Sequence, residues 1–282
     1  MELVNGKSLK RSIYLLADNG SLEARSTLNL RKAAQLVVES TGVEVHPVSL
    51  LHSSKVDPQS LDGVRANAME DFLAGPIAQS SEDLRILPFF FGPSRALTEW
   101  LPEKLDQWKS ERDGRSFRIL DCLHQSGDVR LAMALNDLCL QAIEKNGLKK
   151  PFLALVDHGT PVFEVHRVRE EVGDELKERM ADRISGFSTC SMERRAGEEY
   201  DFNEPLLENL LAEKNGEFEE MLVAQLFLSP GRHAGEGGDL DRICRSFTSS
   251  SSSNRLVRTN LLGVHSLVIE ILCQKIIQDK AS

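Results

Sequence analysis

The sequence predicts an α/β protein built of two similar lobes, each a parallel sheet flanked by helices. Strand-like apolar runs alternate with helical patterns along the chain. The runs lack regular polar alternation, which is typical of parallel strands covered on both faces. Two segments of the first half also recur in the second half. The alternation indicates parallel sheets, and the recurrence indicates that there are two of them.

The recurring segments define two copies of one unit. Residues 86–95 (ILPFFFGPSR) return 137 residues later as residues 223–232 (VAQLFLSPGR). Each copy is an apolar run that ends in a small residue, Pro, a second small residue and Arg. Residues 15–21 (LLADNGS) match residues 155–160 (LVDHGT) in the same way. The chain is therefore predicted to be a duplicated unit of about 140 residues.

The strands are expected at corresponding places in the two halves, at 12–17, 43–51, 84–91 and 117–120, then at 152–156, 186–192, 221–228 and 256–261. The turn-rich, basic stretch 146–151 (NGLKKP) precedes the first strand of the second half. We therefore expect an N-terminal lobe over residues 1–147 and a C-terminal lobe over residues 148–282.

The clearest helix follows the strand at 152–156. Thr160 can cap this helix, and Pro161 can take its first position. Its apolar stripe consists of residues at helical spacing, namely Val165, Val168, Val172, Leu176 and Met180. Its polar face is predicted to carry Arg167, Arg169 and Lys177.

The composition excludes several classes of protein. A hydrophobic content of 41% with 27% charged residues is that of a soluble globular protein, and no apolar run reaches the length of a membrane span. The net charge of −9 speaks against a general nucleic-acid binder, which needs a basic surface. Five scattered cysteines and a polar N-terminus favour free thiols in the cytoplasm, or in an organelle stroma after loss of a transit peptide. A monomer or a homodimer is expected.

Polar residues follow three strands of the second half. His158 comes directly after the strand at 152–156, Glu193 directly after the strand at 186–192, and His233 after the turn that ends the strand at 221–228. Ligands of open parallel sheets bind outside the carboxyl ends of the strands, so these side chains are expected in one site. Two imidazoles and a carboxylate suit a divalent metal such as Fe, Co, Ni or Zn.

The segment 226–239 (LFLSPGRHAGEGGD), with 156–160 (VDHGT) upstream, resembles the sirohydrochlorin chelatase family. These class II tetrapyrrole chelatases insert cobalt or ferrous iron without ATP. The likeness extends over both halves, and its most specific part is residues 230–239. It implies two lobes with a cleft between them, in which strand-end histidines bind the incoming metal over one face of the macrocycle. By position, these residues are His158 and His233, assisted by Glu193.

The resemblance also implies roles for the side chains. His158 is expected to be the principal metal ligand, His233 a second ligand or a base, and Glu193 a source of charge and a proton relay, although the residues alone leave the division between ligand and base open. The only cofactor expected is the substrate metal, Co²⁺ or Fe²⁺, with Ni²⁺ or Zn²⁺ also compatible. Because the tetrapyrrole carries many carboxylates, arginines near the site are expected to bind it. The candidates are Arg232, its repeat partner Arg95, and Arg194 with the adjacent Arg195.

The first half departs from this pattern. Asn19 aligns with His158, and Ala96 aligns with His233, so one metal site per chain is expected. His52 aligns loosely with Glu193. Two other classes stay open. A non-catalytic carrier of the tetrapyrrole or metal would use the same residues, and a two-lobed binding protein for a small anion would require an export signal. A dehydrogenase is excluded because no glycine-rich phosphate loop follows either first strand.

Overall fold

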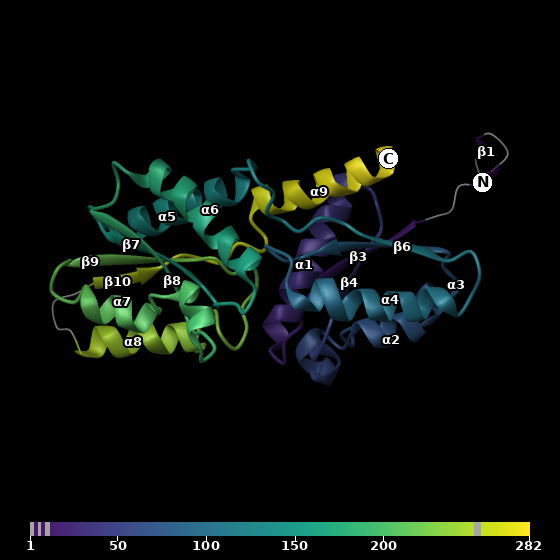
Figure 1. Cartoon of the computed structure of the whole chain (residues 1–282), viewed down its shortest axis with the longest axis horizontal. Helices are drawn as coiled ribbons and strands as arrows, with labels where there is room; N and C mark the ends of the chain where they lie inside the picture. Colours follow the sequence, from purple (N-terminus) through teal and green to yellow (C-terminus); the bar gives the residue numbers. More distant parts are fainter. Residues whose placement is uncertain (1–2, 5–6, 9–11, 251–254) are drawn as a thin grey trace. The chain divides into compact units, whose positions relative to one another are not determined.

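The strands form two four-stranded parallel sheets that share one strand order, β4-β3-β5-β6 in the first half and β8-β7-β9-β10 in the second (Figure 1). This computed structural model describes residues 3–4, 7–8, 12–250 and 255–282. A short antiparallel pair, β1 (Leu3–Val4) and β2 (Lys7–Ser8), precedes the first sheet. The predicted fold class, α/β with two similar parallel-sheet lobes, is confirmed.

The predicted strands of the first half are all present. In chain order the elements are β3 (Ser12–Asp18), α1 (Ala24–Thr41), β4 (Val45–Ser49), η1 (Ser53–Lys55), η2 (Pro58–Leu61), α2 (Met69–Ala74), α3 (Pro76–Ser80), β5 (Asp83–Pro88), η3 (Ala96–Trp100), α4 (Leu101–Ser110) and β6 (Ser116–Ile119). Helix α1 covers one face of the sheet, and α2 and α4 cover the other (Figure 1).

The second half repeats this alternation of strand and helix. Its elements are α5 (Arg130–Asn146), β7 (Phe152–Asp157), α6 (Phe163–Met180), β8 (Gly186–Ser191), η4 (Glu198–Asn203), α7 (Leu207–Glu213), β9 (Glu220–Gln225), α8 (Asp239–Ser250), β10 (Arg255–Arg258) and α9 (Ser266–Ala281). Helices α5 and α6 lie on one face of this sheet, and α7 and α8 on the other (Figure 1). No helix in the part of the chain that is described has the length and apolarity to span a membrane.

The duplication is visible in the hydrogen bonds that extend the ladders beyond the strand ends. Backbone N–H groups donate to backbone carbonyls at 2.7–3.2 Å in matching pairs, first half then second: Leu50 to Asp18 and Met192 to Asp157, Leu51 to Asn19 and Glu193 to His158, Phe89 to Ala17 and Leu226 to Val156. Because each pair joins the same positions of the repeat, the bonds align the two halves residue by residue.

The division into lobes differs from the predicted one at 147/148. One compact unit runs to Leu123 and includes Leu272–Ser282, and the other spans His124–Ile271. Helix α5 belongs to the second unit because its buried apolar face packs on β9, β10 and α6. The end of α9 belongs to the first unit, where Asp279 accepts hydrogen bonds from Tyr14 and Arg118 at 2.9 Å each.

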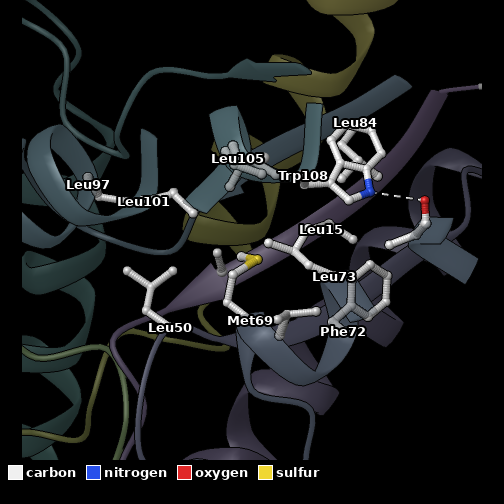
Figure 2. Close-up of a cluster of buried hydrophobic side chains, with 14 residues drawn as sticks. Leu15, Leu50, Met69, Phe72, Leu73, Leu84, Leu97, Leu101, Leu105 and Trp108 are labelled. Atoms are coloured by element: carbon white, nitrogen blue, oxygen red, sulfur yellow. Dashed lines mark hydrogen bonds between the residues drawn. The ribbon is translucent and has the colours of Figure 1, made fainter. Parts of the chain in front are cut away.

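The core of the first unit explains why its short helices hold together. Leu101, Leu105 and Trp108 of α4 are almost fully buried against Met69 and Phe72 of α2 (Figure 2). The indole N–H of Trp108 donates to the carbonyl of Ala78 at 3.2 Å, so burial leaves no polar group of this side chain unpaired. Both tryptophans, Trp108 and the partly buried Trp100, lie in this unit, which makes tryptophan fluorescence a reporter of the first unit alone.

Candidate metal centre

Three loops meet at the carboxyl edge of the second sheet. Strand β7 lies between β8 and β9, and all three strands run parallel. Their carboxyl ends lead into His158, Glu193 and His233. One ligand atom from each of these side chains lies within 4.8 Å of the others. The structure therefore brings together the three residues that the sequence singled out, at the edge where parallel sheets bind ligands.

The three side chains are close enough to share one ion. His158 Nε2 lies 3.4 Å from Glu193 Oε1. The imidazole rings of His158 and His233 are 4.2 Å apart between centroids and meet edge to face at 69°. The exposed fractions of the side chains are 42% for His158, 61% for Glu193 and 31% for His233. All three side chains are therefore partly exposed.

A glycine holds the first two ligands together. Gly159 has φ +91°, and a Cβ at this position would lie 1.9 Å from the carbonyl oxygen of Glu193. Only glycine allows this approach without a backbone shift. The same two loops are joined by the N–H of Glu193, which donates to the carbonyl of His158 at 3.2 Å. The His-Gly pair of the sequence motif thus sets the distance between His158 and Glu193.

The Nε2 atom of His158 faces the carboxylate of Glu193. The Nδ1 atom of the same ring lies 3.1 Å from the carbonyl oxygen of Gly159, which can accept a hydrogen bond from the Nδ1–H tautomer. Nε2 is a buried atom and has no hydrogen-bond partner among the described residues. A divalent cation placed between Nε2 and Glu193 Oε1 would satisfy both atoms, so this donor set fits such an ion.

Burial favours the neutral form of His233. Burial lowers its pKa, and the nearby His158 lowers it further, whereas Asp239 opposes the shift. A lowered pKa keeps the imidazole neutral, which is the form that binds metals. Its Nδ1 lies 2.8 Å from Asp239 Oδ2, so Nε2 is the nitrogen left for an ion.

A buried charge pair behind the candidate metal centre was not predicted from the sequence. Arg169 was predicted on the polar face of its helix, but it is 1% exposed. Its Nη1 donates to Asp157 Oδ1 at 3.2 Å, and the hydroxyl of Ser191 donates to the same oxygen at 2.7 Å. Asp157 also accepts the N–H of Gly159 at 3.0 Å. The available signal was Asp157 itself, because a carboxylate that ends a buried strand needs a partner.

The first lobe carries none of the three ligands at the equivalent positions. The matching hydrogen bonds place Asn19 at the position of His158 and Leu51 at that of Glu193. The looser sequence alignment of His52 with Glu193 is therefore wrong by one residue. Ala96 stands at the position of His233. The expectation of a single metal site per chain agrees with this arrangement of the described residues.

The first lobe also lacks the buried arginine. Asp18 is the counterpart of Asp157, and Leu30 lies twelve residues after it, as Arg169 does after Asp157. Leu30 is buried, and among the described residues no cationic side chain pairs with Asp18. Burial raises the pKa of Asp18 to about 6, although hydrogen bonds from Ser49 and Gly20 oppose this shift.

We expect Asp18→Asn to stabilise the first unit at neutral pH. The folded-state pKa of about 6 exceeds the ordinary value of 3.8, so stability falls as pH rises between these values and stays lower above them. Above both pKa values, the buried and ionised Asp18 lowers the free energy of unfolding by on the order of 3 kcal/mol, and Asn removes most of this loss. Urea unfolding followed by tryptophan fluorescence should show that the variant has a higher free energy of unfolding than the wild type at pH 8 and almost the same value at pH 4. An equal gain at both pH values would contradict a buried, ionising Asp18.

The candidate tetrapyrrole-binding arginines differ in their availability. The Arg232 side chain is 81% exposed, with Nε 3.8 Å from Asp239 Oδ2, and Arg95 is 57% exposed. Arg194 instead forms ion pairs with Asp201 at 2.5 Å and Glu204 at 2.8 Å, which hold the loop after Glu193. Arg195 beside it is exposed. The site therefore offers Arg232 and Arg195 more readily than Arg194.

The fold that carries this site is that of the sirohydrochlorin chelatases, as the sequence resemblance predicted. No protein-family model and no curated protein sequence matches the chain. Solved structures do match, at low sequence identity and over nearly the whole chain.

Three of these structures match over nearly all of both chains. SirB from Bacillus subtilis with Fe³⁺ shares 11% identity, with 95% of each chain covered and a TM-score of 0.70. The sirohydrochlorin chelatase SirB from Bacillus subtilis subspecies spizizenii, in complex with cobalt, shares 12% over 95% of this chain and 94% of that one, with a TM-score of 0.64. CbiX, the terminal enzyme for biosynthesis of siroheme in denitrifying bacteria, shares 14% over 95% and 99%, with a TM-score of 0.60.

Proposed function

We propose that this protein inserts a divalent metal, Co²⁺ or Fe²⁺, into sirohydrochlorin or a related tetrapyrrole without ATP, for siroheme or cobalamin synthesis. The observation that carries the proposal is the convergence of His158, Glu193 and His233 at the carboxyl edge of a sheet on a chelatase fold. The solved structures of similar fold with Fe³⁺ and with cobalt support this class of substrate.

The three ligands suit a metal that must be bound and then released. Metal insertion exchanges one divalent cation for two pyrrole N–H protons, so charge is balanced and no electron moves. Two neutral imidazoles and one carboxylate replace water around the ion with only one negative charge. The ion is held less firmly than in a closed structural site, because the partly exposed side chains leave coordination positions for the macrocycle nitrogens. Glu193 is the most exposed of the three and is suited to receive a released proton.

Arg232 is proposed to bind a carboxylate of the tetrapyrrole. We expect Arg232→Ala to raise KM about tenfold and to change kcat less, because the lost hydrogen bond contributes to ground-state binding. Steady-state insertion rates against tetrapyrrole concentration test this. The matched control is Arg179→Ala in the last turn of α6, toward the amino edge of the sheet, where the one ion pair of Arg179 among the described residues is with Glu175. An unchanged KM for Arg232→Ala would exclude this contact.

The proposal is tested by anaerobic visible absorbance with purified protein, sirohydrochlorin, and Co²⁺ or Fe²⁺. Insertion faster than in the metal-plus-tetrapyrrole blank supports a chelatase, and the relative rates with the two metals report which one is preferred. A carrier would use the same residues but would give a shifted tetrapyrrole spectrum without a rate gain. That second result would replace the proposed enzyme with a carrier.

A further inference from the structure

A carboxylate lies directly behind His233. Asp239 is the first residue of α8, and its Oδ2 approaches His233 Nδ1 at 2.8 Å. The two atoms lie within hydrogen-bonding distance, although the contact is not aligned as a hydrogen bond. Arg242, one turn further along α8, donates to Oδ1 of the same carboxylate. Asp239 is thus held between an arginine and the ring of a metal-site histidine.

A glycine-rich loop makes this contact possible. Between His233 and Asp239 the chain reverses through Gly235 at φ +102° and Gly237 at φ +76°, values that suit glycine. At Gly238 a Cβ would lie 3.0 Å from the carbonyl oxygen of His233. The returning chain is fixed by the N–H of Asp239, which donates to the carbonyl of Arg232 at 3.0 Å. The loop therefore serves to return an acidic residue to the histidine.

The two histidines have different partners at Nδ1. His158 contacts a backbone carbonyl, whereas His233 contacts a carboxylate. In both cases the contact occupies Nδ1 and leaves Nε2 for a metal. Such partners orient histidine ligands and assign their tautomer, and their loss commonly weakens metal affinity by about 10–100-fold.

We propose that Asp239 is a positioning residue for the metal centre. It holds the proton of neutral His233 on Nδ1 and fixes the ring, so that Nε2 completes a three-ligand set with His158 and Glu193. Arg242 in turn fixes the carboxylate. This inference rests on the proposed function, because it assumes that the three side chains bind a metal.

Asp241 supplies a matched control on the same helix. It is buried, pairs with Arg258 and with Arg245 at 2.9 Å, and accepts the N–H of Gly237 at 2.9 Å. Like Asp239, it is a carboxylate that binds arginine near the start of α8. Its contacts hold the loop and the helix rather than a histidine, so its loss reports the structural part of such an effect.

The experiment compares Asp239→Asn, Asp241→Asn and His233→Ala. Co²⁺ alone is titrated into the full-length protein and followed by its visible d–d absorption, and thermal unfolding is measured in parallel. The tautomer of His233 is read from long-range ¹H–¹⁵N spectra of the metal-free protein.

We expect Asp239→Asn to weaken Co²⁺ binding about 10–100-fold with little change in Tm. The Asn amide can also donate to Nδ1, so the proton should move to Nε2. Asp241→Asn should lower Tm through its weaker pairing with arginine. It should change Co²⁺ affinity less than about threefold, since the Asn oxygen can still accept the N–H of Gly237 that holds the loop.

Two results would separately overturn the positioning role of Asp239 and the proposed metal centre. If Asp239→Asn binds Co²⁺ as the wild type does while His233→Ala loses it, Asp239 has no positioning role and the metal centre stands. If His233→Ala itself retains wild-type affinity, the proposed metal centre fails. Arg242→Gln, at a mostly exposed side chain, provides a milder variant in case Asp239→Asn does not fold. Because Asp239 stays but is no longer fixed by Arg242, Co²⁺ binding should weaken in the same direction, and an unchanged Co²⁺ affinity would count against the proposal.

Discussion

His158→Ala is expected to reduce metal insertion to the rate of the metal-plus-tetrapyrrole blank. The substitution removes the imidazole nitrogen that lies 3.4 Å from Glu193 Oε1. Loss of a partner behind a ligand already costs about 10–100-fold in metal affinity, so loss of the ligand itself should cost at least about a hundredfold. Insertion rates and Co²⁺ titration of the same preparation measure both effects.

The fold should survive this change because the side chain is 42% exposed. We expect the free energy of unfolding to change by less than about 1 kcal/mol. His158→Gln keeps a polar side chain of similar size and should lose activity equally. Histidines placed at Asn19 and Ala96 should add no activity, since Leu51 offers no third ligand in that lobe. Normal turnover by His158→Ala would remove this residue from the site.

Arg169→Leu is expected to destabilise the second unit by about 3–5 kcal/mol, because it leaves Asp157 buried without its cation. The first lobe carries Leu30 at this position, so leucine is compatible with the helix and its packing. Adding Asp157→Asn should recover part of the loss, since the unpaired charge is then removed as well. Hydrogen exchange of the β7 amides measures this unit.

Tryptophan fluorescence provides an internal control for the same variants. Trp100 and Trp108 both lie in the first unit, so their unfolding signal should change little in Arg169→Leu. If the free energy of opening measured by β7 amide exchange falls by less than about 1 kcal/mol, the ion pair with Arg169 does not stabilise the buried Asp157 as expected. Full additivity of the two substitutions would lead to the same conclusion, because coupled partners give a non-additive double mutant.

The convergence of His158, Glu193 and His233 was predictable from the sequence because it depends on strand ends. Parallel strands place their carboxyl ends at one edge, so residues that follow three strands of one sheet must lie near one another. The strand order, with β7 between β8 and β9, brings His158, Glu193 and His233 to adjacent ends. The duplication was equally evident, since the repeated segments include both the strand and the turn that ends it.

The positions of Arg169 and Asp239 were not predictable in this way. Helical periodicity placed Arg169 among polar neighbours, whereas its burial depends on the acceptors Asp157 and Ser191, which lie 12 and 22 residues away. The contact of Asp239 with His233 depends on the path of a glycine-rich loop. The boundary between the lobes likewise depends on packing. The sequence shows that α5 has an apolar face, but it does not show which sheet that face covers.

The sequence by itself determined the repeated α/β units, the strand ends and the three ligand-type residues that follow them. These features depend on side-chain periodicity and on the chemistry of turns, both of which are local. Only the tertiary structure decided which charges are paired, which helix covers which sheet, and that Leu51 rather than His52 occupies the repeat position equivalent to Glu193. Those outcomes depend on the pairing of backbone groups and side chains that are distant in the chain, and packing sets their distances.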